Sequence, residues 1–200
     1  MRKNTKEAII AAGLKLFSEK GYLGATTREI AKLAGVSEVT LFRHFTNKQN
    51  LFISVLQQYS FLPQLRELTK ELQKRPLKEA LKVIAINFLN ELRAKRDLIN
   101  IIHAEHKRYP EVLKEYFRNL SDSLITELAE FLRGYEREGI LRDGDIFLMA
   151  QAFFGLFFSY FHCEELEGSM PEYRDEEIVE EYLKIYLRGI LKESLKKNLK

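Results

Sequence analysis

Apolar residues recur every three or four positions along most of this chain of 200 residues. This spacing places them on one side of a helix and is typical of amphipathic α-helices. The first series, which includes Ile9 and Leu16, predicts an N-terminal helix. Asn4 and Glu7 have the spacing of a capping pair, so this helix is expected to begin there and to continue to about Lys20.

The same periodicity predicts a succession of further helices. Their expected ranges are 27–34, 38–44, 48–62, 64–74, 77–92, 97–109, 110–138, 146–161 and 176–198, with a polar loop over 164–175. Pro63 is expected to kink or end the fourth helix, Asp97 to cap the seventh, and Pro110 to begin the longest one. No strand pattern, internal repeat or low-complexity segment stands out. The sequence therefore predicts an all-α protein of about nine helices.

The helix over 146–161 is apolar nearly all round. Such a helix has to be covered on nearly all sides, and one chain of this size covers one face with its own helices. We therefore expect the helices over 146–161 and 176–198 of two copies to form a four-helix bundle in a homodimer. The alternative is that both helices belong to the core of a monomer. The run contains Gln151 and Ser159 and is shorter than the ~20 residues of a membrane span, so no membrane partner is expected.

The segment from Thr26 to Phe45 splits into two short helices joined by a tight turn. Thr26 and Glu29 have the spacing of a capping box, which begins the first helix. Gly35 suits the left-handed conformation that ends a helix, and Ser37 suits the cap of the next one. Together these features are typical of a helix-turn-helix, whose second helix carries polar side chains to DNA.

The chain contains the pattern T-x-x-x-I-A-x-x-A-G-V-S-x-x-T-L-[YF]-x-[HY]-F-x-x-K, which ends at Lys48. From Thr27 to Lys48 it resembles the DNA-binding domain of TetR-type (TetR/AcrR) transcriptional regulators. The resemblance implies a DNA-binding domain over 1–46. It also implies an effector-binding and dimerisation domain over 47–200, in which 47–62 is a connecting helix.

The resemblance further implies which side chains meet double-stranded operator DNA. Phosphate contacts fall to Thr27, Thr40, His44 and Lys48, and base-edge contacts fall to Ser37, Glu38, Val39 and Arg43. Arg28 and Phe42 complete the predicted set, although Phe42 stands where tyrosine is commoner and so lacks a hydroxyl group. Arg43 is the strongest physical candidate for sequence reading, because its guanidinium can bond both acceptors of a guanine. The alternative is that these are ordinary surface residues of a small bundle.

Charge is distributed unevenly along the chain. The first 50 residues hold nine basic and four acidic side chains, a net charge of +5, whereas the whole chain carries +3 and the remainder is at −2. A basic N-terminal part is expected of a DNA-binding module attached to a body that does not touch DNA. Cys163 is the only cysteine, which excludes an intramolecular disulfide, and the N-terminus lacks a signal-peptide core. A cytoplasmic location is therefore expected.

Aromatic residues of the middle helices indicate a cavity for a small, apolar effector, since ligand pockets are mostly apolar. The candidates are Phe88, His103, Phe117, Phe154 and Phe157, each of which is alternatively a core residue. His103 and His106 lie three positions apart, but no carboxylate-rich motif accompanies them, so no metal site is expected. No catalytic or phosphate-loop motif is found, so no enzymatic activity and no cofactor are expected.

The sequence thus predicts a homodimeric, ligand-responsive transcriptional regulator, specifically a repressor that binds a palindromic operator and is released by its effector. Two alternatives stay open at this point. One is a DNA-binding regulator without an effector. The other is a helical small-molecule carrier or enzyme whose basic N-terminal helices are incidental.

Overall fold

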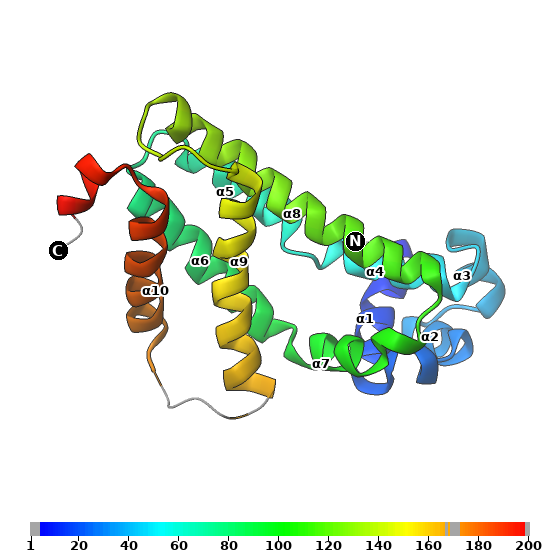
Figure 1. Cartoon of the computed structure of the whole chain (residues 1–200). Coiled ribbons are helices and arrows are strands. Elements are labelled where there is room, and N and C mark those ends of the chain that lie inside the picture. The colour runs from blue at the N-terminus through cyan, green and yellow to red at the C-terminus, as the bar shows by residue number, and fades with distance from the viewer. Residues whose placement is uncertain (1–4, 167, 169–172, 199–200) are drawn as a thin grey trace. The chain divides into compact units, whose positions relative to one another are not determined.

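The structure is a computed structural model, and it describes residues 5–166, 168 and 173–198. Within these ranges the chain forms α-helices and no β-strand, apart from an isolated bridge between Leu141 and Leu191. The helices are α1 (Thr5–Gly24), α2 (Thr27–Ala34), α3 (Glu38–His44), α4 (Lys48–Gln58), α5 (Leu62–Leu72), α6 (Leu77–Ala94), α7 (Arg96–Glu105), α8 (Glu111–Arg137), α9 (Ile146–Phe161) and α10 (Asp175–Ile190) (Figure 1). The predicted all-α fold is confirmed.

The chain divides into two compact units. Unit 1 consists of residues 1–60 and 95–118, and unit 2 consists of residues 61–94 and 119–200. The chain therefore leaves unit 1 after α4, builds α5 and α6 in unit 2, and returns to unit 1 for α7. The long helix α8 begins in unit 1 and ends in unit 2.

Unit 1 has its own hydrophobic core. Phe17 of α1 and Phe52 of α4 are fully buried, and their ring centroids lie 4.7 Å apart in an edge-to-face arrangement. Ile30 and Leu41 bring α2 and α3 into the same core. Side chains from the returning segment complete it: Leu98, Tyr109 and Leu113. Burial of each large apolar side chain stabilises the unit by about 1.5–3 kcal/mol, so α7 and the start of α8 contribute to holding α1–α4 together.

The backbone of α1 breaks at Gly21, where its predicted helix ends, and one short turn follows. Gly21 has φ 74° and ψ 172°, a conformation that is essentially restricted to glycine. The carboxylate of Glu105 lies over this residue, only 2.4 Å from the position that a Cβ atom would occupy. The amide of Leu23 donates to Glu105 Oε2 over 3.3 Å. Glu105 of α7 therefore fits the break because residue 21 has no side chain.

Unit 2 is built around α6. The helices α9 and α10 run antiparallel side by side, and α6 crosses behind both (Figure 1). Asp145 caps α9 by accepting hydrogen bonds from the amides of Phe147 and Leu148 over 2.8 and 3.1 Å. The buried hydroxyl of Tyr186 in α10 donates to the Met149 carbonyl of α9 over 2.8 Å. Burial raises the pKa of Tyr186, so this donor keeps its proton at neutral pH.

Two predicted helix boundaries, at Pro63 and at Asp97, are wrong. Pro63 does not end the fourth helix, because α4 already ends at Gln58 and Pro63 lies in the first turn of α5. Proline suits that position since a first-turn residue has no helical acceptor for an N–H group. Asp97 lies inside the first turn of α7 rather than at its cap, which is Lys95.

The last predicted helix is too long. The helix α10 ends at Ile190, Leu191 is extended, and a 3-10 turn covers Glu193–Asn198. The Arg142 amide donates to the Ile190 carbonyl over 2.8 Å, so a loop before α9 satisfies the end of α10. The predicted polar loop is shorter at its start, because a π-helical turn covers His162–Leu166. The predicted cap Asn4 lies outside the described residues, as do 167 and 169–172 of the loop.

Candidate functional site

The helix-turn-helix begins with the predicted capping box. The Glu29 amide donates to Thr26 Oγ1 over 3.2 Å, and the Thr26 amide donates to Glu29 Oε2 over 3.1 Å. The Lys20 ammonium lies 2.6 Å from the other Glu29 oxygen. Hydrogen bonds from Lys20 and Thr26 lower the pKa of Glu29 to about 2. This carboxylate therefore stays ionised while it fixes the start of α2.

The turn places α3 with one buried side and one exposed side. Gly35 adopts the left-handed conformation with φ 70°, and Ser37 accepts a hydrogen bond from the Thr40 amide over 3.1 Å. Leu41 is fully buried and anchors α3 in the core of unit 1. On the outer side Val39 is 80% exposed and Phe42 is 42% exposed. These two side chains leave apolar groups of this seven-residue helix open to solvent.

Arg43 and His44 share this exposed side of α3. Together with Val39 and Phe42 they form what we call the α3 face. It offers a guanidinium with a fork of donors, an imidazole and two apolar groups. These are the groups that bind guanine acceptors, phosphate oxygens and thymine methyls in a major groove.

Thr27 and Glu38 make a contact that the sequence did not predict. The Thr27 hydroxyl donates to Glu38 Oε1 over 2.5 Å and so joins the first residue of α2 to the first residue of α3. Both residues are half-buried. The bond holds the carboxylate of Glu38 at the edge of the α3 face, where it restrains the angle between the two helices.

Lys48 lies at the start of α4, and its ammonium points into unit 1. It donates to the Ala25 carbonyl over 2.9 Å and lies 4.6 Å from the centroid of the Tyr22 ring. Burial lowers the pKa of Lys48, and the negative charge of Glu105 opposes this shift. An ammonium group carries three N–H donors. Lys48 therefore braces the link between α1 and α2 and keeps donors for a further acceptor.

Unit 2 holds a cavity of about 430 Å³. It lies among α6, α8 and α9, and its lining residues are Phe88, Leu92, Ser121, Leu124, Ile125, Gln151, Phe154, Gly155 and Phe158. The volume falls within the range of small-molecule sites, and the lining is mostly apolar, as such sites usually are.

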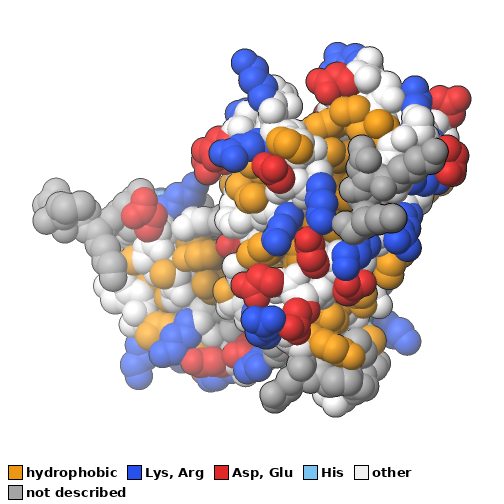
Figure 2. Space-filling view, turned by 90° about the vertical axis from the view of Figure 1, so that its left-hand side faces the viewer, with side chains coloured by type: hydrophobic (Ala, Val, Ile, Leu, Met, Phe, Trp, Pro, Cys, Tyr) orange, Lys and Arg blue, Asp and Glu red, His pale blue; other side chains and the backbone are white. Residues whose placement is uncertain are grey.

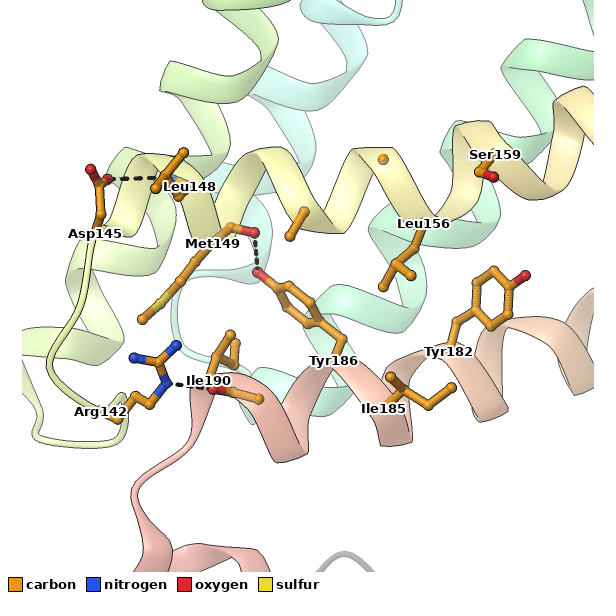
Figure 3. A pocket seen from close by; sticks show the side chains of 13 residues that line it. Arg142, Asp145, Leu148, Met149, Leu156, Ser159, Tyr182, Ile185, Tyr186 and Ile190 are labelled. Carbon is orange, nitrogen blue, oxygen red and sulfur yellow. Dashed lines mark hydrogen bonds between the residues drawn. The ribbon is translucent and has the colours of Figure 1, made fainter.

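A second hollow, of about 670 Å³, runs between α9 and α10, and we call it the α9/α10 groove. Figure 3 shows Leu156 of α9 and Tyr182 and Ile185 of α10 around this space, with the Tyr186–Met149 hydrogen bond beside them. Leu148 is 58% exposed and Ile185 is 61% exposed. The groove therefore leaves large apolar side chains in contact with water within a single chain.

Charged side chains give little other indication of a site. On the face shown in Figure 2, lysine and arginine side chains lie among aspartate and glutamate side chains, so the charge there is mixed rather than of one sign. Among the described residues no group of three or more His, Cys, Asp or Glu side chains is arranged to hold a metal ion. The chemistry of the molecule accordingly centres on the α3 face, the cavity and the groove.

Comparison with known proteins identifies the family. The sequence pattern of "Bacterial regulatory proteins, tetR family" matches residues 9–55, and that of "AefR-like transcriptional repressor, C-terminal domain" matches residues 79–189. The chain is also 30% identical over 190 residues to the HTH-type transcriptional regulator YvkB of Bacillus subtilis (strain 168), a match that covers 93% of this chain and 97% of YvkB. The chain belongs to the TetR family. The predicted family, and a DNA-binding rather than an enzymatic class of protein, are confirmed.

Other relatives and solved structures agree with this membership. The TetR-family chain is 29% identical over 157 residues to the fatty acid metabolism regulator protein of Bacillus subtilis (strain 168), covering 74% of this chain and 76% of that protein. A TetR-family regulator from Mesorhizobium loti MAFF303099 superposes with a TM-score of 0.80 at 24% identity, covering 94% and 97% of the two chains. The regulator FadR from Bacillus subtilis, solved with stearoyl-CoA, superposes with a TM-score of 0.72 at 22% identity, covering 92% and 98%. These two structures share the fold.

In this TetR-family chain the predicted DNA-binding residues gather in one part of unit 1. They lie on α2, at the start or along the length of α3, or at the first position of α4. Arg28, Ser37 and the residues of the α3 face are exposed, whereas Thr40 is half-buried, as are Thr27, Glu38 and Lys48. Their roles toward DNA stay predictions.

The predicted effector-binding residues do not gather in one place. Phe88 and Phe154 line the cavity, and their rings lie 4.9 Å apart. Phe157 is fully buried in unit 2 and is not among the lining residues. His103 and Phe117 belong to unit 1, where His103 is exposed and Phe117 stacks on Tyr109. Seven further lining residues were not predicted. Six of them are not aromatic and carry no chemical signal that distinguishes a cavity wall from a core, and Phe158 is one of several aromatic residues of α9 that the sequence does not separate.

Proposed function

We propose that this chain is a ligand-responsive transcriptional repressor that binds a palindromic operator as a homodimer and is released by a small, apolar effector. Residues 1–46 bind the DNA together with Lys48, residues 47–200 bind effector and partner, and residues 47–62 connect the two. The observation that carries the proposal is the α3 face, which exposes Val39 and Arg43 while Leu41 anchors the same helix in the core. The family pattern over residues 79–189, named for a repressor, supports the repressor role.

DNA recognition divides between positioning and reading. We assign phosphate contacts to Thr40, His44 and Lys48, because groups that meet the backbone fix the register of the protein on the duplex. We assign base reading to Arg43, whose paired donors match guanine, and to Val39, whose methyl groups match thymine. Each good bidentate contact is worth about 1–3 kcal/mol of discrimination between bases. Ser37 and Glu38 lie beside them at the start of α3.

The partner is a second copy of this chain, docked at the α9/α10 groove. Four helices, α9 and α10 from each copy, then form a two-fold bundle that covers Leu148 and Ile185. Gly155 and Gly189 line the groove and leave open space beside their Cα atoms, which allows another helix to approach closely. A dimer is needed because one short helix reads too few bases, and two reading helices about 34 Å apart read a palindrome.

A covered groove also explains the apolar character of α9 without a membrane. Residues 146–164 are long and apolar enough to span one, and 44% of that window is buried within the chain itself. Asp145 at its start and Arg142 beside it line the groove together with the apolar residues. A protein surface accommodates such charged groups at its rim, whereas hydrocarbon does not. We accordingly propose a cytoplasmic protein.

The effector acts by shifting populations between two arrangements of the dimer. It occupies the cavity among α6, α8 and α9 in the arrangement whose two α3 faces are spaced wrongly for the operator. A near-complete switch requires the effector to favour that arrangement by about 5.5 kcal/mol. The solved FadR complex with stearoyl-CoA supports the general idea that this fold binds an effector.

A salt titration against a random duplex tests the DNA-binding part of the proposal. Binding by several lysine and arginine side chains releases counterions, so the logarithm of the binding constant is expected to fall linearly with the logarithm of the salt concentration. Thr40→Ala, which removes one predicted phosphate contact without changing charge, should weaken binding while the slope stays the same. Failure to bind the duplex even at low salt contradicts the proposal and favours the helical carrier instead.

A further inference from the structure

The wall and the mouth of the cavity in unit 2 differ in chemistry. Phe88, Leu92 and Phe154 are buried and form its base. Ser121 of α8 and Gln151 of α9 are exposed and lie at its mouth. A ligand in this cavity therefore meets hydrocarbon on most sides and polar side chains where the cavity opens to solvent.

None of the nine lining residues carries a charge. The residue that follows Leu92 along α6 is Arg93, but its guanidinium is already held by acids. It lies 2.6 Å from Glu164 Oε2 and also bonds Asp175, so its charge is compensated within the chain. Because an ion that leaves water without a partner pays a large desolvation penalty, a charged group at the base of the cavity is strongly disfavoured.

The two polar residues at the mouth are neutral hydrogen-bonding groups. Ser121 supplies a hydroxyl, and Gln151 supplies an amide with both donors and acceptors. Neither side chain makes a hydrogen bond to another group in the part of the chain that the structure describes. Both are therefore available to a neutral polar group of a ligand whose apolar body lies deeper.

The cavity volume bounds the size of that body. At roughly 30 Å³ for each water-sized group, 430 Å³ accommodates about 14 non-hydrogen atoms. We propose that the cavity takes an uncharged amphiphile, with an apolar body of this size and one neutral hydrogen-bonding group that meets Ser121 and Gln151. The inference rests on the proposed effector function and names the chemical class of the effector.

Three decyl compounds with different head groups test the proposal by isothermal titration calorimetry on the full-length protein. They are 1-decanol, decanoate and decyltrimethylammonium, each used below its aggregation concentration. All three fit the size limit and share the decyl chain, while their head groups differ in charge and in hydrogen-bonding capacity. We expect 1-decanol to bind at least tenfold more tightly than either ion.

A cation placed at the mouth should remove the preference for 1-decanol over decanoate. Ser121→Lys adds a cation at an exposed position and is expected to strengthen decanoate binding at least tenfold over the wild-type protein. Thr126→Lys is the matched control, because residue 126 is exposed on the same helix and does not line the cavity, and it should leave decanoate binding unchanged.

Two results would overturn the proposal. One is that decanoate or decyltrimethylammonium binds the wild-type protein as tightly as 1-decanol. The other is that none of the three compounds binds. The same preparation is assayed for duplex binding in parallel, so a protein that binds DNA but no decyl compound disproves the effector class and leaves the regulator function standing.

Discussion

Removal of the Ile185 side chain beyond Cβ should strongly weaken the homodimer that we propose. Ile185→Ala deletes three carbon atoms, and at about 0.8 kcal/mol for each buried methylene their full burial is worth roughly 2.4 kcal/mol. Because 61% of this side chain is exposed within one chain, burial by the partner contributes roughly 1.5 kcal/mol of that amount. Two-fold symmetry doubles the loss to about 3 kcal/mol, which corresponds to a dimer dissociation constant raised by roughly a hundredfold.

Sedimentation velocity over a dilution series measures this dissociation constant directly. Val83→Ala is the control, since Val83 is also partly exposed on unit 2 but does not line the α9/α10 groove, and its dimer should match that of the wild type. The thermal unfolding of each variant monomer shows whether the fold is retained. A dissociation constant for Ile185→Ala within threefold of the wild-type value would refute the assignment of the interface to this groove.

Further predictions concern unit 1. Lys48→Ala should weaken binding to all DNA sequences about equally and lower the salt slope by about one per protomer. The same variant should also lose folding stability, because its bond to the Ala25 carbonyl is removed. Arg43→Ala should instead relax the preference at one base position by about 1–3 kcal/mol. Competition binding with single-base operator variants separates the two, and a uniform loss for Arg43→Ala would disprove its reading role. The pKa of Glu29 lies below its ordinary value, so its contribution to the free energy of unfolding should be complete above pH 4.5 and be lost as the pH falls toward 2. In Glu29→Gln the free energy of unfolding should therefore depend less on pH in that window. A carboxyl NMR titration of Glu29 with a midpoint near 4.5 would contradict this. Gly21→Ala should destabilise the protein by about 3 kcal/mol, because a β-carbon strains the backbone and meets the Glu105 carboxylate. The melting temperature should fall by roughly 6–12 °C. An unchanged melting temperature would show that the break in α1 is not constrained.

The helix-turn-helix could be predicted from the sequence because short-range interactions determine it. The capping box of Thr26 and Glu29, the left-handed Gly35 and the cap at Ser37 each involve residues no more than three or four positions apart. A pattern along the chain contains such information in full. The family resemblance covered the same segment, and the family pattern that matches residues 9–55 confirms it.

Contacts between distant segments could not be predicted in this way. Lys48 donates to Ala25, which lies 23 positions earlier, and no periodic pattern indicates that its ammonium points inward. Periodicity likewise shows that α7 has an apolar side, but not that Leu98 packs with α1–α4 in unit 1. The helix α10 ends at Ile190 because the loop at Arg142 pairs with it, although the sequence beyond is suited to a helix.

Two of the five predicted effector-binding residues line the cavity of unit 2, and their role toward an effector stays a prediction. Phe88 and Phe154 are aromatic residues on the apolar sides of middle helices, and both line the cavity. Phe157, one turn after Phe154, satisfies the same criterion and is instead packed against Phe153 and Tyr182. A difference of three positions along a helix rotates a side chain by about 60°, which is enough to move it from the cavity to the core.

Selection of duplexes from a random-sequence library by the purified full-length protein, with the stoichiometry of the selected complex measured by light scattering, tests whether two joined copies read one operator. We expect an enriched palindrome whose half-sites lie about one helical turn apart, bound by two protomers, because in the proposed dimer the α9/α10 groove joins two copies and each copy presents one α3 face. Enrichment of no sequence, or of a single asymmetric half-site bound by one protomer, would contradict it.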